Sequence, residues 1–111
     1  MVGSTFAVFK HQVVPETWIA ESLRPHVATG IEFAGIAPQG AQYGYLWWTG
    51  HLVWHEREVA WSAAFGNGGQ RIFVVPDLDL GIVTTGGDYG SIDTAIAVNR
   101  LLAQIVGTVA Q

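Results

Sequence analysis

The chain has 111 residues and a formal net charge of −4, and half of its residues are hydrophobic while 13% are charged. This length limits the chain to a single domain over residues 1–111 with one modest core, and the apolar balance excludes a disordered chain. The five Lys and Arg residues are scattered singly, so no basic patch can replace the counterions of a nucleic acid, and no nucleic-acid partner is expected.

Targeting signals and cysteines say little about where the protein works. No apolar run approaches the ~20 residues that cross a membrane, and Met1 to Lys10 lacks the pattern of a signal peptide, so we expect a soluble chain without a membrane partner. The absence of cysteine excludes disulfides and cysteine-bound metals but leaves the compartment open. A natural short protein and a fragment of a longer one both agree with the abrupt start of the sequence.

The first predicted elements are a short helix and a loop. Pro15 suits the first turn of a helix, and apolar side chains then recur at helical spacing until Pro25, which stops the run. Residues 28–42 contain several glycines and no sustained period, so this stretch is predicted to be a connecting loop.

Three strands are predicted next. In residues 43–48, Tyr43, Tyr45 and Trp47 alternate with Gly44, Leu46 and Trp48. Both alternating groups are apolar, which is the pattern of a strand covered on both faces. Residues 52–55 and 59–65 continue the aromatic and β-branched content. The charged tip at 55–58 predicts a hairpin between them with a solvated turn.

The last part of the chain predicts a second hairpin and a long helix. Strands over 71–75 and 81–85 flank the turn residues 76–79. Ser91 is a good helix N-cap, apolar residues follow at helical spacing, and Gly107 is predicted to end the helix. The sequence therefore predicts an α+β fold, in which an antiparallel β-sheet meander follows a short N-terminal helix and a C-terminal helix packs on the sheet.

Four stretches of the chain carry a family resemblance. They are Val13 to Ser22, Tyr43 to Trp48, Ala64 to Gln70 and Phe73 to Val83, in this order over nearly the whole sequence. Together they resemble the serine β-lactamase family, and most of all its class C and esterase-like members, which include aminohexanoate-oligomer hydrolases. The resemblance implies that this chain is the C-terminal part of a β-lactamase-like α/β domain and has a partial β-lactamase-like fold.

The nucleophile of that family is absent from this sequence. The family attacks its substrate with the serine of a Ser-x-x-Lys motif, but the only lysine here is Lys10, and the residue three positions before it is Ala7. No Tyr-x-Asn or Ser-x-Asn motif occurs either. The resemblance therefore implies a C-terminal fragment of a serine hydrolase that is inactive alone.

The third family motif, Lys-Thr-Gly or His-x-Gly, falls on Ala64, Phe65 and Gly66, of which only the glycine matches. By the resemblance, Ala64, Phe65, Gly66 and Gly68 line the substrate, and the backbone N–H of Asn67 is one oxyanion donor. Ala64 in place of Lys or His favours an esterase- or amidase-like parent. The same residues also agree with a plain hairpin turn, because Asn-Gly is a common turn pair. No cofactor is implied.

Two histidines suggest a metal hypothesis. His51 and His55 stand four residues apart with Glu56 beside them, so a zinc site is conceivable. Two ligands do not make a site, and exposed polar residues at a hairpin tip are the simpler interpretation. We therefore predict no metal site.

The tryptophans could form a platform for sugars or peptides, because indole faces stack well and keep a polar N–H. A small sheet without disulfides also needs large side chains for its core. We assign Trp47 and Trp61 to the core and leave Trp48 and Trp54 as candidate interface residues.

The resemblance also implies a partner. In the intact family fold this sheet is covered by N-terminal strands and helices that the chain does not contain. Bare apolar surface and strand edges normally mark an interface. We therefore expect a homo-oligomer or a complex with the missing N-terminal part of the hydrolase. The alternative function is a non-enzymatic self-associating or ligand-binding module.

Overall fold

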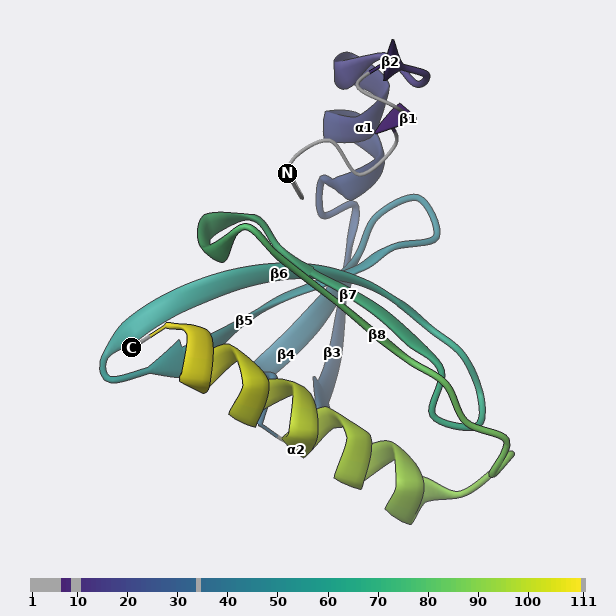
Figure 1. The fold of residues 1–111 in the computed structure, drawn as a ribbon, viewed down its shortest axis with the longest axis vertical. Coiled ribbons are helices and arrows are strands. Elements are labelled where there is room, and N and C mark those ends of the chain that lie inside the picture. Colours follow the sequence, from purple (N-terminus) through teal and green to yellow (C-terminus); the bar gives the residue numbers. More distant parts are fainter. Residues whose placement is uncertain (1–6, 9–10, 34, 111) are drawn as a thin grey trace.

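The computed structural model describes residues 7–8, 11–33 and 35–110. It shows the predicted α+β fold, with an antiparallel sheet, a short helix near the N-terminus and a long C-terminal helix (Figure 1). The elements in chain order are β1 Ala7–Val8, β2 His11–Gln12, α1 Glu16–Leu23, β3 Val27–Phe33, β4 Ala37–Tyr43, β5 Trp48–Trp54, β6 Arg57–Phe65, β7 Arg71–Val75, the 3-10 helix η2 Pro76–Leu78, β8 Leu80–Thr84 and α2 Ile92–Val109.

The main sheet is an antiparallel meander in the order β3-β4-β5-β6-β7-β8. Each strand pairs with its neighbour in sequence, so β3 and β8 form the two edges. α2 runs along one face of the sheet, and α1 projects from the other end of the molecule (Figure 1). We call the face that packs on α2 the inner face and the opposite one the outer face.

The core lies between the inner face and α2. Its residues come from every second position of the central strands, as the strand period requires, and from one face of α2. The indole N–H of Trp61 donates a hydrogen bond of 2.6 Å to the carbonyl of Ile36, so its polar atom is satisfied. The buried set is Ile36, Ala37, Ala41, Leu52, Val59, Trp61, Ala63, Phe73, Val75, Leu102 and Val106.

α2 begins where the sequence predicts but ends later. The hydroxyl of Ser91 accepts a hydrogen bond of 3.1 Å from the backbone N–H of Thr94, which confirms the predicted N-cap. The prediction that Gly107 ends the helix is wrong. This glycine is buried within α2 because Trp54 packs against it, and a Cβ atom there would lie 2.6 Å from the indole ring.

Within the described residues, α2 is the one helix that is long and apolar enough, by length and composition, to cross a membrane. The core helix of a globular domain meets the same criterion. α2 places Leu102 and Val106 in the core against the sheet, and 22% of the helix is buried in the structure.

Residues 28–42 form most of the β3-β4 hairpin, so the prediction of a loop is wrong. The glycines that suggested a loop instead allow the two strands to pair closely. Gly30 and Gly40 both have positive φ, and a Cβ atom on Gly40 would lie 3.5 Å from the backbone of Gly30. The pairing also shifts register between Ala28 and Ile31, so these glycines permit a bulged pair of strands with close backbones.

The predicted strand over 43–48 is also wrong, because the chain reverses there. The backbone N–H of Gly44 donates to the carbonyl of Trp47 at 2.8 Å, and Leu46 takes a φ of 64°. Next to them the N–H of Tyr45 donates to the carbonyl of Ser22 at the end of α1. The turn at 44–47 is therefore where α1 docks on the sheet.

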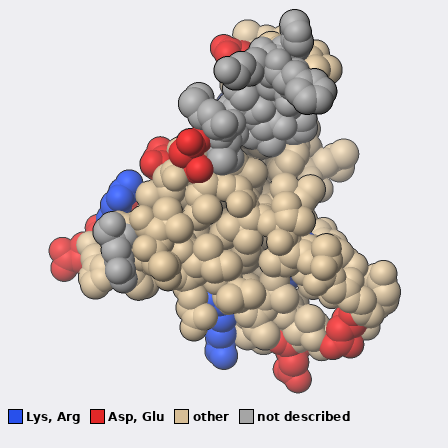
Figure 2. Space-filling model, in the orientation of Figure 1, with Lys and Arg blue, Asp and Glu red and all other residues tan. Residues whose placement is uncertain are grey.

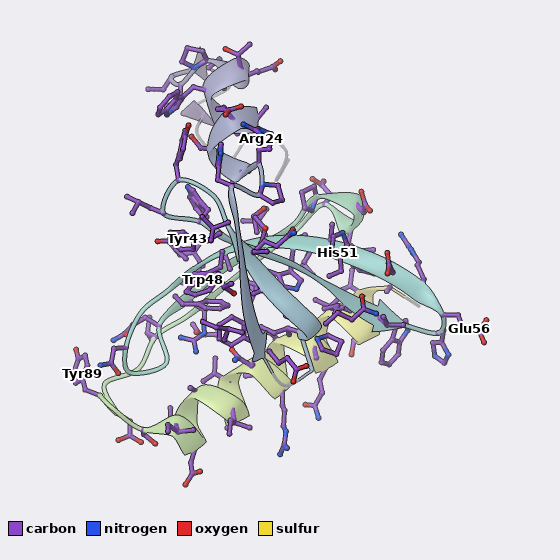
Figure 3. The ribbon with its side chains drawn as sticks, turned by 180° about the vertical axis from the view of Figure 1, so that it is seen from behind. Arg24, Tyr43, Trp48, His51, Glu56 and Tyr89 are labelled. Atoms are coloured by element: carbon purple, nitrogen blue, oxygen red, sulfur yellow. The ribbon has the colours of Figure 1, made fainter. Side chains whose placement is uncertain are left out.

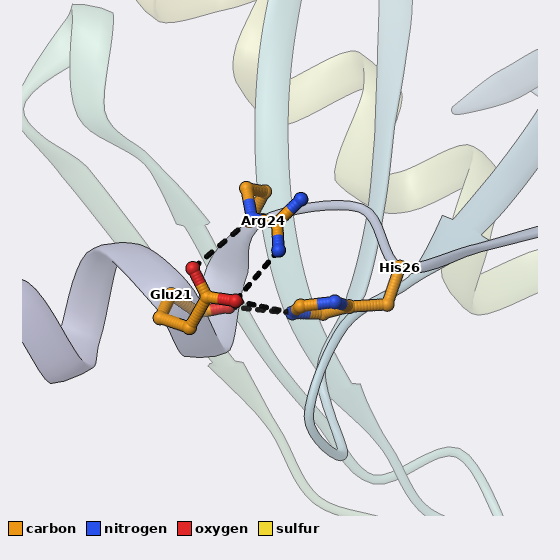
Figure 4. A network of polar contacts seen from close by, with 3 residues as sticks. All are labelled: Glu21, Arg24 and His26. Carbon is orange, nitrogen blue, oxygen red and sulfur yellow. Dashed lines mark hydrogen bonds and ion pairs between the residues drawn. The ribbon is translucent and has the colours of Figure 1, made fainter.

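A polar network fixes the end of α1 (Figure 4). The guanidinium of Arg24 donates to the carboxylate of Glu21 at 2.6 and 3.1 Å, and this interaction lowers the pKa of Glu21. The His26 ring lies 2.8 Å from the Glu21 carbonyl and stacks on Tyr45 with ring centroids 4.2 Å apart. The network orients the segment that joins α1 to β3.

The tryptophans that form the core are only partly the predicted ones. Trp61 is in the core as predicted, but Trp47 is outside it and lines an apolar hollow of about 280 Å³ between α1 and the turn at 44–47. Trp48 and Trp54 are half-buried and pack against the core. The low charge of the chain is visible in Figure 2, where acidic and basic side chains lie mainly at the periphery.

Candidate functional site

The turn that joins β6 to β7 is closed by a backbone hydrogen bond. The N–H of Gly66 donates to the carbonyl of Gln70 at 2.8 Å. Between them, Gly68 and Gly69 have φ values of 125° and 97°, which side-chain-bearing residues rarely adopt. The segment is therefore a turn between two strands, as the plain-turn interpretation predicted, and its backbone conformation requires the two glycines.

The last residue of β8 and the loop after it support the turn through three hydrogen bonds. The hydroxyl of Thr84 donates to the Gly69 carbonyl at 2.7 Å, and the amide of Gln70 donates to the Gly86 carbonyl at 2.5 Å. The side-chain oxygen of Asn67 accepts from the backbone N–H of Gly90 at 2.7 Å. The side chains of Asn67 and Gln70 are therefore both engaged within the protein.

Arg71 supports the turn from the inner face. This side chain is 6% exposed, and its Nη1 donates to the carbonyls of Gly66 at 3.0 Å and Gln70 at 2.9 Å. Its Nε donates to Asn99 of α2 at 3.2 Å, and its guanidinium carbon lies 4.5 Å from the centroid of the Phe65 ring. Burial lowers the pKa of Arg71 from its ordinary value.

Arg71 is a functional candidate that the sequence analysis missed. Within the described ranges, no carboxylate lies within ion-pair distance of its guanidinium. A signal was present in the sequence, because Arg71 shares its strand phase with the apolar residues Phe73 and Val75. A charged residue in the buried phase of a strand is rare unless it is paired or has a role.

A shallow groove of about 420 Å³ lies at the turn end of β6, β7 and β8. Ala64, Ile72 and Val83 stand opposite one another in the register and form a row on the outer face, because they are out of phase with the buried residues. The small side chain of Ala64 and the lack of one at Gly66 leave the space open. The groove is lined by Ala64, Phe65, Gly66, Gln70, Arg71, Ile72, Val83, Thr84 and Thr85.

Three of the four predicted substrate-lining residues line this groove, and the fourth is buried within the turn. Ala64, Phe65 and Gly66 line the groove. Gly68 is buried, and a Cβ atom there would lie 3.1 Å from the ring of Tyr89. Figure 3 shows Tyr89 at the end of the molecule, in the loop that joins β8 to α2. Gly68 therefore contributes to the packing of the turn and is not a lining residue of the groove.

Asn67 follows Gly66 in the turn and is not itself among the residues that line the groove. Among the residues that the structure describes, no acceptor takes a hydrogen bond from its backbone N–H. A backbone amide normally has a partner in the protein, in water or in a ligand. Asn67 is exposed, so water or a ligand can accept from this amide.

No activated nucleophile is formed by the described part of the chain. Ser22 is buried at the end of α1, Ser62 lies on β6, and Ser91 caps α2. In these ranges no histidine or lysine hydrogen-bonds to a serine hydroxyl. Ser4 and Lys10 lie outside the described residues.

His51 and His55 do not converge. His51 is exposed on β5, while His55 sits in the hairpin turn with a φ of 48° and packs its ring edge-on against Trp54. Figure 3 shows His51 on the strand and Glu56 at the hairpin tip. Within the described residues, no group of three or more His, Asp or Glu side chains could hold a metal ion.

Comparison with known protein families, with curated proteins and with solved structures finds no match for this chain. The resemblance to serine β-lactamases therefore stays a prediction, and a function for the chain has to be inferred from the geometry of the turn and the groove.

Proposed function

We propose that the chain contributes the strand, turn and oxyanion donor of a serine hydrolase site whose nucleophile lies in another segment or chain. The observation that supports the proposal most directly is the Asn67 amide, which has no acceptor among the described residues and follows Gly66, a lining residue of the groove. An amide held in this way can stabilise the negative charge that develops on a carbonyl oxygen during acyl transfer.

The groove supports a neutral ester or amide as substrate. Its side chains from Ala64, Ile72 and Val83 are apolar, and Ala64 stands where the resembled family places a cationic or imidazole group. A groove of this kind offers little for the carboxylate of a lactam antibiotic. It suits the apolar body of an ester or amide whose carbonyl meets the Asn67 amide.

The first test of the proposal compares the chain alone with a longer one. The purified chain should not hydrolyse a nitrophenyl ester or nitrocefin above the buffer rate, because the described residues form no activated serine and the sequence has no Ser-x-x-Lys motif. The coding DNA upstream of Met1 should encode a Ser-x-x-Lys motif in frame, and the extended protein should hydrolyse the ester. Both rates are measured by release of the coloured product.

The matched control replaces the serine of that motif in the extended protein with alanine, which should abolish the reaction. Turnover by the short chain that a fluorophosphonate blocks would contradict the assignment of the nucleophile to another segment. An in-frame stop codon directly upstream, together with no activity from any neighbouring gene product mixed with the chain, would contradict the proposal itself.

A second candidate function is self-association through the outer face. Val53, Ile72 and Val83 of this face are 51%, 47% and 70% exposed. β8 is also an edge of the sheet, so its unpaired backbone groups can accept another strand. These features favour a second copy of the chain or a complementary strand as the partner.

Val83→Glu tests this association, because it places a charge on both the edge strand and the outer face. In sedimentation velocity at micromolar concentration, the unmodified chain should run as a dimer or larger species, and the variant should run as a monomer. Ile92→Glu is the matched control, because Ile92 is 76% exposed on α2 and lies off the sheet. A monomeric unmodified chain would rule this function out.

A further inference from the structure

The peptide between Gly66 and Asn67 is held from one side. Its carbonyl oxygen, on Gly66, accepts a hydrogen bond of 3.0 Å from Nη1 of Arg71. The Arg71 guanidinium lies toward α2, because its Nε bonds Asn99 of that helix and its carbon stacks over the inner-face residue Phe65. The Gly66 carbonyl therefore points toward the inner face.

Peptide geometry then fixes the direction of the Asn67 N–H. No cis peptide occurs in the described chain, and in a planar trans peptide the N–H points opposite to the C=O. Since the Gly66 carbonyl points toward the inner face, the Asn67 N–H points away from that face, and Gly66, the residue before it, lines the groove. The lack of an acceptor for this N–H among the described residues agrees with that direction.

We propose that Arg71 is a positioning residue, which orients the Gly66–Asn67 peptide so that the Asn67 N–H faces the carbonyl oxygen of an ester or amide in the groove. This inference rests on the proposed hydrolase function for its ligand, whereas the orienting contact is a property of the chain by itself.

The charge of Arg71 strengthens the same site. A guanidinium keeps its proton in a protein, and no carboxylate of the described residues lies close enough to neutralise this one. A cation beneath the peptide raises the positive potential at the Asn67 N–H, and such a field favours an oxyanion over a neutral carbonyl.

A purely structural role for Arg71 would be to join α2 to the sheet through Asn99. Two of its hydrogen bonds nevertheless go to the turn, to the carbonyls of Gly66 and Gln70, which are also the two residues that close it. Removing Asn99 and removing Arg71 should therefore have different effects on the turn, and this difference is the basis of the test.

The test measures the direction of the Asn67 N–H by residual dipolar couplings on the ¹⁵N-labelled full chain. In the unmodified chain this coupling should match the orientation that the Asn67 N–H bond has in the structure. In Arg71→Met, which keeps the apolar stem and removes the donors, the Asn67 coupling should change while those of β5 and β6 are kept. Exchange of the Gly66 N–H with solvent should accelerate about fivefold, as expected for a weakened hydrogen bond.

Asn99→Ala is the control, because it leaves both bonds from Arg71 to the turn, and its Asn67 coupling should match the unmodified chain. If Arg71→Met does not fold, Arg71→Lys is measured instead, because a single ammonium cannot hold both carbonyls and Asn99. An Asn67 coupling that does not match the orientation of the bond in the structure, or that is the same in the folded Arg71 variant, would overturn the inference. Failure of the hydrolase proposal would appear separately, as an extended protein without activity but with the same Arg71-dependent vector.

Discussion

Trp61→Ala should lower the free energy of unfolding by about 3–5 kcal/mol, the usual cost of removing a buried large aromatic side chain. Trp61 is 2% exposed, stacks near Phe73 with ring centroids 5.0 Å apart, and covers Gly50 on the neighbouring strand. The substitution also leaves the Ile36 carbonyl without its donor. The whole free energy of unfolding of a natural domain is only about 5–15 kcal/mol, so this variant should be only marginally stable.

Urea denaturation followed by far-ultraviolet circular dichroism measures this loss without relying on tryptophan fluorescence. Trp18→Ala is the matched control, because Trp18 is 56% exposed and its ring contact with Tyr45 contributes only about 0.5–1.5 kcal/mol. Trp61→Phe keeps an aromatic ring but not the indole N–H, so it separates the packing from the hydrogen bond to Ile36. Equal losses for Trp61→Ala and Trp18→Ala would contradict the placement of Trp61 in the core.

Asn67→Pro should lower kcat of the extended hydrolase by about 10²–10³-fold, the usual effect of removing one oxyanion donor. Proline has no backbone N–H, so the variant removes the group that we assign to the oxyanion. KM should change less than kcat, because the interaction is stronger in the transition state than with the bound ester.

Asn67→Ala separates the backbone from the side chain. It keeps the N–H and removes the side-chain oxygen that accepts from Gly90, so kcat should fall by no more than about fivefold, as for one lost hydrogen bond. Equal kcat values for the two variants, with both proteins folded by circular dichroism, would remove the Asn67 amide from the mechanism.

The elements that the sequence predicts correctly are those whose signals are local. Ser91 marks the start of α2 because its hydroxyl bonds an N–H three residues later, and such a contact needs no other part of the chain. The β7-β8 hairpin is predicted for the same reason, since Pro76 and the residues after it form a turn between two β-branched runs. The need for large core side chains, in contrast, is not a local signal, and it assigned Trp61 to the core correctly but Trp47 incorrectly.

Two of the predicted elements that are wrong, the helix end at Gly107 and the strand over 43–48, depend on contacts between distant segments. Gly107 resembles a helix end, but Trp54 of β5 requires a glycine inside the helix. A Cβ atom on Gly44 would lie 2.2 Å from the Ser22 carbonyl, so the docking of α1 requires a turn where aromatic alternation predicts a strand. Local periodicity cannot show such contacts, because it contains no information about which segment lies opposite.

The sequence by itself determined the α+β class, the absence of a Ser-x-x-Lys motif and the position of the turn at Gly66. Only the tertiary structure decided which way that turn faces. Arg71, Thr84 and Gly90 come from three different places along the chain and hold it by hydrogen bonds. The direction of a peptide N–H is set by what binds the carbonyl beside it, and in this protein that partner is a buried arginine which α2 covers.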